Sequence, residues 1–301
     1  MIQLYIIAAQ GNIRSRALAT INALHRAILT SPETLPNIEF SLSVADENKS
    51  EAQWIYARKQ GDTLPWLMPD FGYFSWPEPK IGAYGEVQMR ARLVDEEKSW
   101  KDKVDKLLWR GALLKLRVRT TLIKATKGKE WADVVSLNWR NRNSMRNDLK
   151  SMDQHCEYKY LAHTEGVSYS GRLKYLQNCR SVVIAHKLDY IQHHHPLMRS
   201  SGPEQNYVEV DREWQRLEAA IMHLRGNDTA AEAIADRMAT TFRDRYLTPA
   251  AETCYWRKLM RAWAEVSFEP ELFEEKDGKK KLRGLPVESY LIERRLDWQP
   301  Y

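Results

Sequence analysis

The chain has 301 residues, of which 43% are hydrophobic and 29% charged, a composition that excludes a disordered or fibrous protein. Its length predicts two compact domains, and its longest apolar runs, such as residues 2–9, fall far short of the roughly 20 residues that cross a bilayer. The formal net charge of +6 is a small excess that suits an anionic ligand without identifying one.

The first third of the chain predicts one helix, one strand and one shaped loop. Residues 15–29 place aliphatic side chains on one face at helical spacing, and residues 38–44 alternate apolar and polar side chains as a strand does, ending in the polar loop 45–48. Residues 64–79 are rich in proline and aromatic residues, which favours an irregular loop. The charged amphipathic stretch 86–105 leads into the second part.

The rest of the chain alternates short apolar runs with helical patterns, as parallel α/β sheets do. We expect five strands in a Rossmann-like domain, within residues 106–109, 132–137, 158–162, 181–185 and 207–210. After Asp211 the pattern is helical: residues 213–224, a helix capped near residues 227–228, and a helix that starts near Pro249 and runs through Trp256 and Trp263. The tail from Glu274 has the composition of a solvated surface segment.

Two arginines follow expected strands. Arg172 ends the glycine- and serine-rich loop 166–172 just before a short helix, where backbone N–H groups and a guanidinium favour an anion. Arg110 ends an earlier apolar run and precedes Gly111. Two such guanidiniums can hold a diphosphate. The residues alone leave a surface turn open for the loop, and an ion pair or a sheet-edge cap open for Arg110.

Asp70 stands among aromatic residues in the proline-rich loop. Partial desolvation there raises the basicity of a carboxylate, and the rings offer flat faces for sugars. A simple Asx turn at residues 69–72 is the alternative. The three consecutive histidines at 193–195 have no second cluster of ligands with suitable spacing, so we expect no metal site.

The most specific stretch of the chain is Cys156-Glu157-Tyr158-Lys159-Tyr160-Leu161, followed by Gly166-Val167, Ser170-Gly171-Arg172, Cys179 and Ser181-Val182-Val183. Together with residues 3–5, 69–79, 109–111 and 253–256, in this order, it resembles glycosyltransferase family 90. That family contains fungal capsule-associated xylosyltransferase-like proteins and animal protein O-glucosyltransferases, and the Trp76-Pro77-Glu78 segment resembles the fungal branch. The resemblance covers about residues 3–266.

The resemblance implies a GT-B fold, in which two Rossmann-like domains face each other across a cleft and a C-terminal helix crosses back. Residues 1–100 would form the acceptor-side domain, residues 101–255 the domain that binds the UDP-sugar, and residues 256–301 a helix and tail that pack back on the first. The implied reaction is inverting transfer of xylose or glucose to a hydroxyl of a glycan or glycoprotein, with no metal or other cofactor, no nucleic acid and no membrane contact by this chain.

The resemblance also implies roles for particular residues. Asp70 would be the base, and Arg110 and Arg172 would contact the diphosphate. The remaining residues on the donor side would be Gly111, Gly166, Val167, Ser168, Ser170 and Asp189, and those on the acceptor side Asp46, Phe71, Tyr73 and Trp76. Animal members have serine and aromatic residues where this chain has Ala112 and Gly171, which bears on substrate choice.

The family's paired cysteines match Cys156 and Cys179, so the resemblance predicts a disulfide and the lumen of the endoplasmic reticulum or Golgi; Cys254 would stay free. A signal or anchor for that location is not visible, so we expect a longer natural protein or a fragment. Two alternatives stay open: a basic module that binds acidic glycan or nucleic acid, and an inactive relative in which Asp70 turns away from Arg110 and Arg172.

Overall fold

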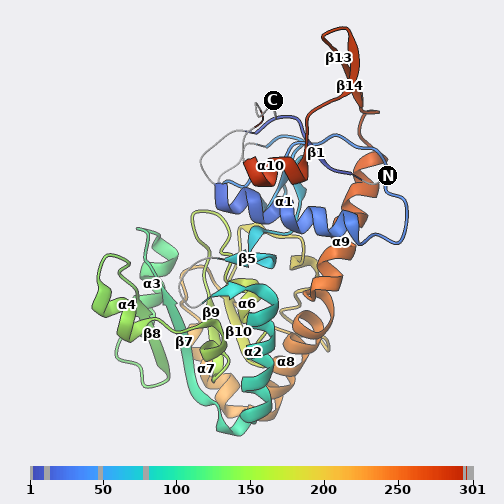
Figure 1. Ribbon diagram of the computed structural model, residues 1–301. Coiled ribbons are helices and arrows are strands. Elements are labelled where there is room, and N and C mark those ends of the chain that lie inside the picture. Colours follow the sequence, from blue (N-terminus) through green and yellow to red (C-terminus); the bar gives the residue numbers. More distant parts are fainter. Residues whose placement is uncertain (1–2, 10–13, 47–49, 77–80, 294–295, 297–301) are drawn as a thin grey trace.

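The computed structural model describes residues 3–9, 14–46, 50–76, 81–293 and 296. A parallel sheet with helices on both faces occupies one part of the molecule, and α1 and α10 lie beyond one end of it (Figure 1). The sheet positions the candidate site.

The sheet has five strands, all parallel, in the order β12-β10-β9-β7-β8. Each lies where an apolar run predicted a strand: β7 (Val104–Gly111), β8 (Ala132–Ser136), β9 (Tyr158–His163), β10 (Val182–His186) and β12 (Val208–Val210). The register pairs Leu107 with both Ala132 and Tyr160. The Rossmann-like character expected of this part of the chain is therefore confirmed at the level of the sheet.

Alternate residues of the three central strands, β10, β9 and β7, enter two different cores. Leu107 and Trp109 pack with α3 (Arg117–Thr126) and α7 (Leu217–Gly226) on one face. Leu108 packs on the other face with α2 (Tyr84–Glu97), α5 (Met152–His155) and α6 (Leu173–Leu176). Helix α8 (Asp228–Thr241) contributes to both cores. Burial on both faces explains why these strands read as continuous apolar runs.

The described residues before α2 form a helix and short strands. Helix α1 (Arg14–Leu29) matches its prediction. The strands have two residues each: β1 (Tyr5–Ile6), β2 (Trp54–Ile55), β3 (Arg58–Lys59), β4 (Trp66–Leu67), β5 (Ser75–Trp76) and β6 (Gly82–Ala83). The strand expected over 38–44 is wrong in extent, because only an isolated bridge joins Leu42 to Trp54. The division into two Rossmann-like domains stays a prediction.

Aromatic packing holds this first part together and ties it to the end of the chain. Trp54 stacks on Phe40 with 3.8 Å between ring centroids and meets Trp256 and Trp263 of α9 (Pro249–Ala264). Thr248 is the N-cap of α9, and its side chain accepts from the Ala251 N–H. The boundary expected between residues 255 and 256 falls inside this continuous helix.

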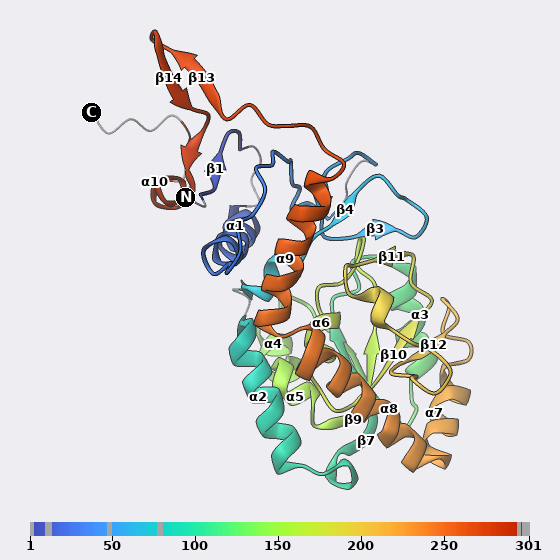
Figure 2. The same cartoon turned by 90° about the vertical axis from the view of Figure 1, so that its right-hand side faces the viewer.

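Helix α9 crosses back from the sheet to α1, as Figure 2 shows. The Arg257 Nε donates to the carbonyl of Ala27 at 2.9 Å, and the Trp263 indole N–H donates to the carbonyl of Glu39. Beyond it, β1 pairs with β15 (Leu285–Pro286), which leads into α10 (Val287–Glu293). The exposed hairpin of β13 (Phe273–Lys276) and β14 (Lys279–Leu282) projects from this end of the molecule (Figures 1 and 2).

The remaining elements are short. They are the 3-10 helices at Phe71–Tyr73, Trp100–Asp102 and His195–Leu197, the π-helix Phe242–Tyr246, α4 (Arg142–Asp148) and β11 (Tyr190–Ile191). Cys156 and Cys179 form the expected disulfide, and Cys254 is free and exposed. Among the described residues, no helix combines the length and the apolar character that a membrane crossing requires.

Candidate functional site

The sheet order fixes where a ligand can bind. Strand β7 lies between β8, the next strand in sequence, and β9, so the strand order reverses direction between β7 and β9. In open α/β sheets, ligands bind at the carboxyl ends of the strands beside this reversal. Here that point is flanked by Gly111, which ends β7, and by His163, which ends β9.

Arg172 reaches this point from the residue before α6. Its guanidinium lies 5.8 Å from the Trp109 ring, and among the described residues it has no hydrogen bond or ion pair with an acidic group. Burial, and then the nearby charge of Arg119, lower the pKa of Arg172 to about 9. An uncompensated cation is costly inside a protein, so this place favours an anion.

Two glycines allow the close packing around Arg172. A Cβ at Gly111 would lie 2.8 Å from the Trp109 indole and 3.1 Å from the Arg172 Nη2. A Cβ at Gly166 would lie 2.8 Å from the carbonyl oxygen of Tyr169. Both positions therefore require glycine, which gives a physical reason for the Arg-Gly and Gly-Val segments of the sequence.

Three polar groups at the end of β9 and in the loop after it are buried. Among the residues that the structure describes, the hydroxyls of Thr164 and Ser168 and the Nδ1 of His163 have no hydrogen-bond partner, although each residue is at most 2% exposed. Buried polar atoms are normally satisfied. These three atoms are thus available to a ligand at the carboxyl end of β9.

Three further residues expected on the donor side differ in exposure. Ser170 accepts from the Leu173 N–H through its carbonyl and so forms the turn into α6. The side chain of Val167 is exposed. Asp189 is also exposed, and its carboxylate forms an ion pair of 2.9 Å with Arg212.

Arg110 is held in an ion pair. Its Nη2 donates to the Asp133 Oδ1 at 2.6 Å, and its other nitrogens donate to carbonyl oxygens, including that of Asp148 at 2.8 Å. Both Arg110 and Arg172 lower the pKa of buried His155, after burial itself, so both charges act on one imidazole. Arg110 directly precedes Gly111, which Arg172 approaches, but the hydrogen-bonding capacity of Arg110 is engaged.

Asp70 is closed to solvent. Its Oδ1 accepts from the Gly72 N–H at 2.8 Å and lies 2.8 Å from the Lys174 Nζ, while its Oδ2 accepts from the same Nζ at 2.9 Å. The side chain has no exposed surface. A base must reach the acceptor hydroxyl, so this geometry does not support the expectation that Asp70 takes the proton. The Asx-type contact that was the alternative is present as the cap of the 3-10 helix.

The other residues expected on the acceptor side divide into buried and accessible ones. Phe71 and Tyr73 are buried in the cores and offer no open ring face. Trp76 is half-buried and fills the space above Gly171, where a Cβ would lie 2.8 Å from its ring. The Pro77-Glu78 that follows Trp76 lies outside the described residues.

Asp46 is the accessible carboxylate in this region. Its side chain is 47% exposed, and its Oδ1 accepts from the Arg16 Nη1 at 2.7 Å. The Arg16 guanidinium lies 5.0 Å from the Phe71 ring, and Phe71 packs in the same core as Tyr169 of the loop 166–172. Asp46 is therefore connected through Arg16 to the core that holds this loop, and its Oδ2 has no hydrogen bond among the described residues.

Sequence reasoning missed Lys174 and Arg119. Lys174 lies only two residues after Arg172, but its partner Asp70 is 104 residues away, a pairing that no local pattern indicates. Arg119 belongs to a helix whose surface carries several basic residues, so composition does not single it out. The missed signal was the break in amphipathic pattern, since Arg119 occupies a position on the buried face of α3.

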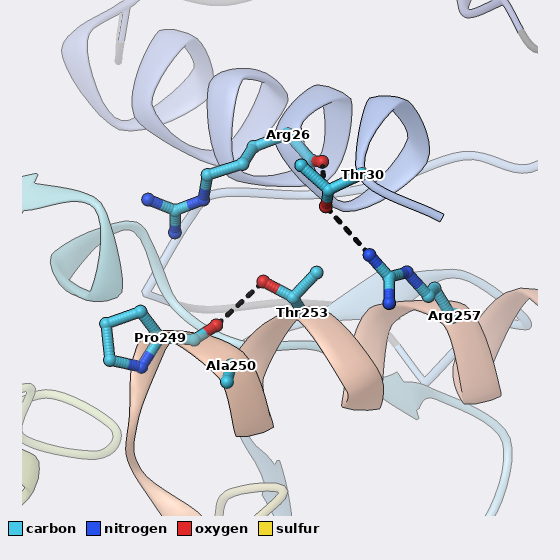
Figure 3. Close-up of a pocket in the computed structure, with 6 residues that line it drawn as sticks. All are labelled: Arg26, Thr30, Pro249, Ala250, Thr253 and Arg257. Carbon is cyan, nitrogen blue, oxygen red and sulfur yellow. Dashed lines mark hydrogen bonds between the residues drawn. The ribbon is translucent and has the colours of Figure 1, made fainter. Parts of the chain in front are cut away.

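A separate surface cavity of about 350 Å³ lies between α1 and α9. Figure 3 shows the side chains that line it, including Arg26, Thr30 and Arg257. Arg257 donates to Thr30 at 2.7 Å, and Arg26 is paired with Glu252 at 2.8 Å. Arg26 has an acidic partner and Arg257 is partly exposed, so the cavity does not have the buried, unpaired charge found at Arg172.

The side chains of the described residues include no group of three or more His, Cys, Asp or Glu that could hold a metal ion. What the geometry defines is an α/β protein with an anion-binding site at the strand-order reversal of a parallel sheet.

The chain belongs to glycosyl transferase family 90, because residues 2–277 match that family. It is 25% identical over 259 residues to the O-glucosyltransferase rumi homolog of Aedes aegypti, covering 77% of this chain and 62% of that protein. It is 24% identical over 209 residues to protein O-glucosyltransferase 1 of Homo sapiens, covering 66% of this chain and 52% of that protein. The chain thus spans between about half and three fifths of the length of these curated relatives.

Solved structures show a distant likeness. Anabaena Alr3699/HepE in complex with UDP-glucose is 11% identical, with a TM-score of 0.39, over 58% of this chain and 53% of that one. The C-terminal domain of the glycosyl transferase group 1 family protein LpcC from Francisella tularensis is 11% identical, with a TM-score of 0.35, over 58% of this chain and 96% of that one.

Proposed function

We propose that this protein is an inverting glycosyltransferase that moves glucose or xylose from a UDP-sugar to a hydroxyl of a glycoprotein or glycan without a metal ion. The observation that carries the proposal is Arg172, a guanidinium without an acidic partner at the carboxyl edge of the sheet. Membership of family 90 and the similarity to O-glucosyltransferases support the reaction class.

On the donor side, Arg172 binds the diphosphate directly. As the bond to the sugar breaks, negative charge grows on the UDP, and a fixed guanidinium in a partly desolvated site stabilises that charge in the transition state. Arg110 adds its positive charge from within its ion pair with Asp133. The unpartnered hydroxyls of Thr164 and Ser168 supply further donors.

On the acceptor side, we assign the base to Asp46 in place of Asp70. Inverting transfer needs a carboxylate that reaches the attacking hydroxyl. Asp46 is exposed and is connected through Arg16 to the core that holds the loop 166–172, whereas both oxygens of Asp70 are bound to Lys174. Arg16 holds Asp46 in place through one oxygen and leaves the other for the acceptor.

The two alternatives have less support. A binding module for acidic glycan or nucleic acid would carry a continuous basic surface, but the uncompensated cations here converge at the end of the sheet. An inactive relative was expected if Asp70 turned away from Arg110 and Arg172. Asp70 does point to Lys174, yet Asp46 offers an exposed carboxylate that Arg16 holds through one oxygen.

The disulfide supports a location in the lumen of the secretory pathway, because such bonds persist in oxidising compartments. The relatives' names indicate protein acceptors, which makes a glycoprotein the first acceptor to test.

The test is a donor screen by UDP release on wild-type protein, with and without EDTA. We expect release from UDP-glucose or UDP-xylose that EDTA does not reduce. Asp46→Asn should lower kcat by about 10²- to 10⁴-fold with little change in the KM for the donor. Arg172→Met should lower kcat by about a hundredfold or more. Asp105→Asn, which replaces an exposed carboxylate paired with Arg225 away from the site, is the control. Absence of UDP release from every donor, with or without divalent metal, would contradict the proposal.

A further inference from the structure

Arg119 lies on α3, three residues into the helix, and its side chain runs beneath the strand-order reversal. The Nε donates to the carbonyl of Glu165 at 3.0 Å, and the Nη1 donates to the carbonyl of Ala112 at 2.6 Å. These carbonyls belong to the segments that follow β9 and β7. One guanidinium therefore bridges the two sides of the site.

The charge of Arg119 has no counterpart. Among the described residues no carboxylate forms an ion pair with it, although it is only 6% exposed. Burial is the one cause that lowers its pKa, to about 10. Paired arginines elsewhere in the chain, such as Arg180 with Asp236 and Glu232, show the ordinary arrangement.

The third nitrogen of Arg119 points toward the candidate site. The Nη2 has no hydrogen bond among the described residues and lies 3.7 Å from where a Cβ of Gly166 would be. The guanidiniums of Arg119 and Arg172 lie 6.0 and 5.8 Å from the same Trp109 ring. Both also lower the pKa of His163, to a lesser extent than burial does.

Two buried cations that repel each other, and that form no ion pair among the described residues, are stabilised together by one bound anion. The ligand that fits has negative charge on two adjacent centres, because the two guanidiniums approach from different elements, α3 and the loop before α6. A diphosphate meets this requirement.

We propose that Arg119 is a second direct ligand of the donor diphosphate, which its Nη2 binds opposite Arg172. This inference rests on the proposed function for the identity of the ligand, but the two-arginine site itself does not. Its Nε and Nη1 meanwhile keep the segments after β7 and β9 in place.

The chain offers a matched control in Arg117. It lies two residues earlier on the same helix, is highly exposed, and pairs with Glu213 at 3.1 Å. Replacing it changes the net charge of the protein by the same amount without touching the site.

The experiment measures binding of UDP, uridine and inorganic pyrophosphate by calorimetry to wild type, Arg119→Met, Arg119→Lys and Arg117→Met. We expect Arg119→Met to weaken UDP and pyrophosphate by about tenfold or more, the effect of losing a charged hydrogen bond. Uridine, which lacks phosphate, should bind as to wild type. Arg119→Lys keeps a charge without the planar fork and should lose part of the affinity for UDP, and it serves if Arg119→Met fails to fold. Arg117→Met should match wild type with all three probes.

The outcomes separate the two proposals. Equal weakening of UDP and uridine by Arg119→Met would show a purely structural role and overturn the inference, as would unchanged UDP binding. Wild-type protein that binds pyrophosphate but not UDP, with the binding lost in Arg119→Met, would support the two-arginine site while overturning the assignment of a UDP-sugar donor.

Discussion

Asp70 and Lys174 form an ion pair that is shielded from solvent by aromatic rings. The Lys174 Nζ lies 4.7 Å from the Tyr175 ring centroid, 5.5 Å from that of Tyr73 and 5.6 Å from that of Trp76. It also donates to the carbonyl of Gly171. The pair therefore fastens the loop that carries Arg172 to the 3-10 helix after Asp70, and we interpret it as structural.

Asp70→Asn should lower the free energy of unfolding by about 3–5 kcal/mol, because it leaves the Lys174 ammonium buried without a counter-charge. Urea denaturation measures this change. Asp70→Asn combined with Lys174→Met should lose less than the sum of the single changes. Glu213→Gln, which breaks the exposed pair with Arg117, should cost no more than about 1 kcal/mol.

A variant that keeps its stability and loses its activity would contradict the structural role of Asp70. If Asp70→Asn kept its full stability and lost turnover while still binding UDP, Asp70 would be the base after all, and the assignment of Asp46 would be wrong.

Local sequence predicted Arg172 and its loop correctly as a position near the end of a strand, because strand, glycine and helix signals are all contiguous there. Local sequence could not show which of the two aspartates, Asp70 or Asp46, is accessible to an acceptor hydroxyl. Burial decides between them, and the burial of Asp70 comes from Lys174 and Tyr175, about a hundred residues further along the chain.

At the scale of elements, the disulfide joins Cys156, two residues before β9, to Cys179 in the turn after α6. The strand, the loop 166–172 and the short helix all lie between the two cysteines. Because α6 has only four residues, its own hydrogen bonds cannot hold it in place. The covalent link therefore limits how far the Arg172 loop can open.

Cys156→Ala with Cys179→Ala should lower the free energy of unfolding by about 3 kcal/mol, the expected effect of opening a loop of this size. UDP affinity should fall as well, because Arg172 is then held less firmly. Denaturation with and without a reductant, and UDP titration, measure the two effects. Cys254→Ala is the control, since that thiol is free and exposed. Unchanged stability in the double variant would contradict the role given to the bridge.

Elements were predictable where burial is two-sided. The three central strands of the sheet, β10, β9 and β7, coincide with continuous apolar runs, whereas the edge strands β8 and β12 are only partly buried. The alternating residues 38–44 have the same period as a strand, but Phe40 stacks on Trp54 and only one bridge forms. The apolar side chains there are buried by ring packing and not by a sheet. The alternation of apolar and polar residues therefore indicated extended backbone, but not pairing along a neighbouring strand.

At the scale of the whole molecule, the site depends on strand order, which the sequence did not predict. Neighbouring apolar runs show that strands exist, but not that β7 pairs with β9 as well as with β8. That pairing brings Gly111, Arg119 and Arg172 to one point. The helical pattern after Pro249 predicted α9, yet its passage to α1 depends on contacts such as that of Arg257 with Ala27, between segments 230 residues apart.

Buried histidines near the sheet give the whole protein a pH dependence. His155, His163, His186 and His194 are each at most 2% exposed. Burial lowers the pKa of His155 to about 3 and that of His186 to about 4, and it places those of His163 and His194 well below the usual 6.5. The folded protein keeps these rings neutral, whereas the unfolded chain binds protons below about pH 6.5.

Acid should therefore destabilise the fold. Between the lowered pKa of each histidine in the folded protein and its usual value of about 6.5, the unfolded chain binds more protons than the folded protein does. The stability that these histidines contribute is therefore fully present above about pH 6.5. It is lost as the pH falls toward 4, by about 1.4 kcal/mol per pH unit for each histidine. His186 links this loss to the site, because its Nε2 accepts from the Glu165 N–H at 3.1 Å, and a proton on Nε2 removes that acceptor. Thermal unfolding from pH 7.5 to 5 should show a falling midpoint, with a shallower slope in His186→Gln and an unchanged slope in a variant of exposed His223. A midpoint that stays constant over this range would show that the rings take up protons in the folded state.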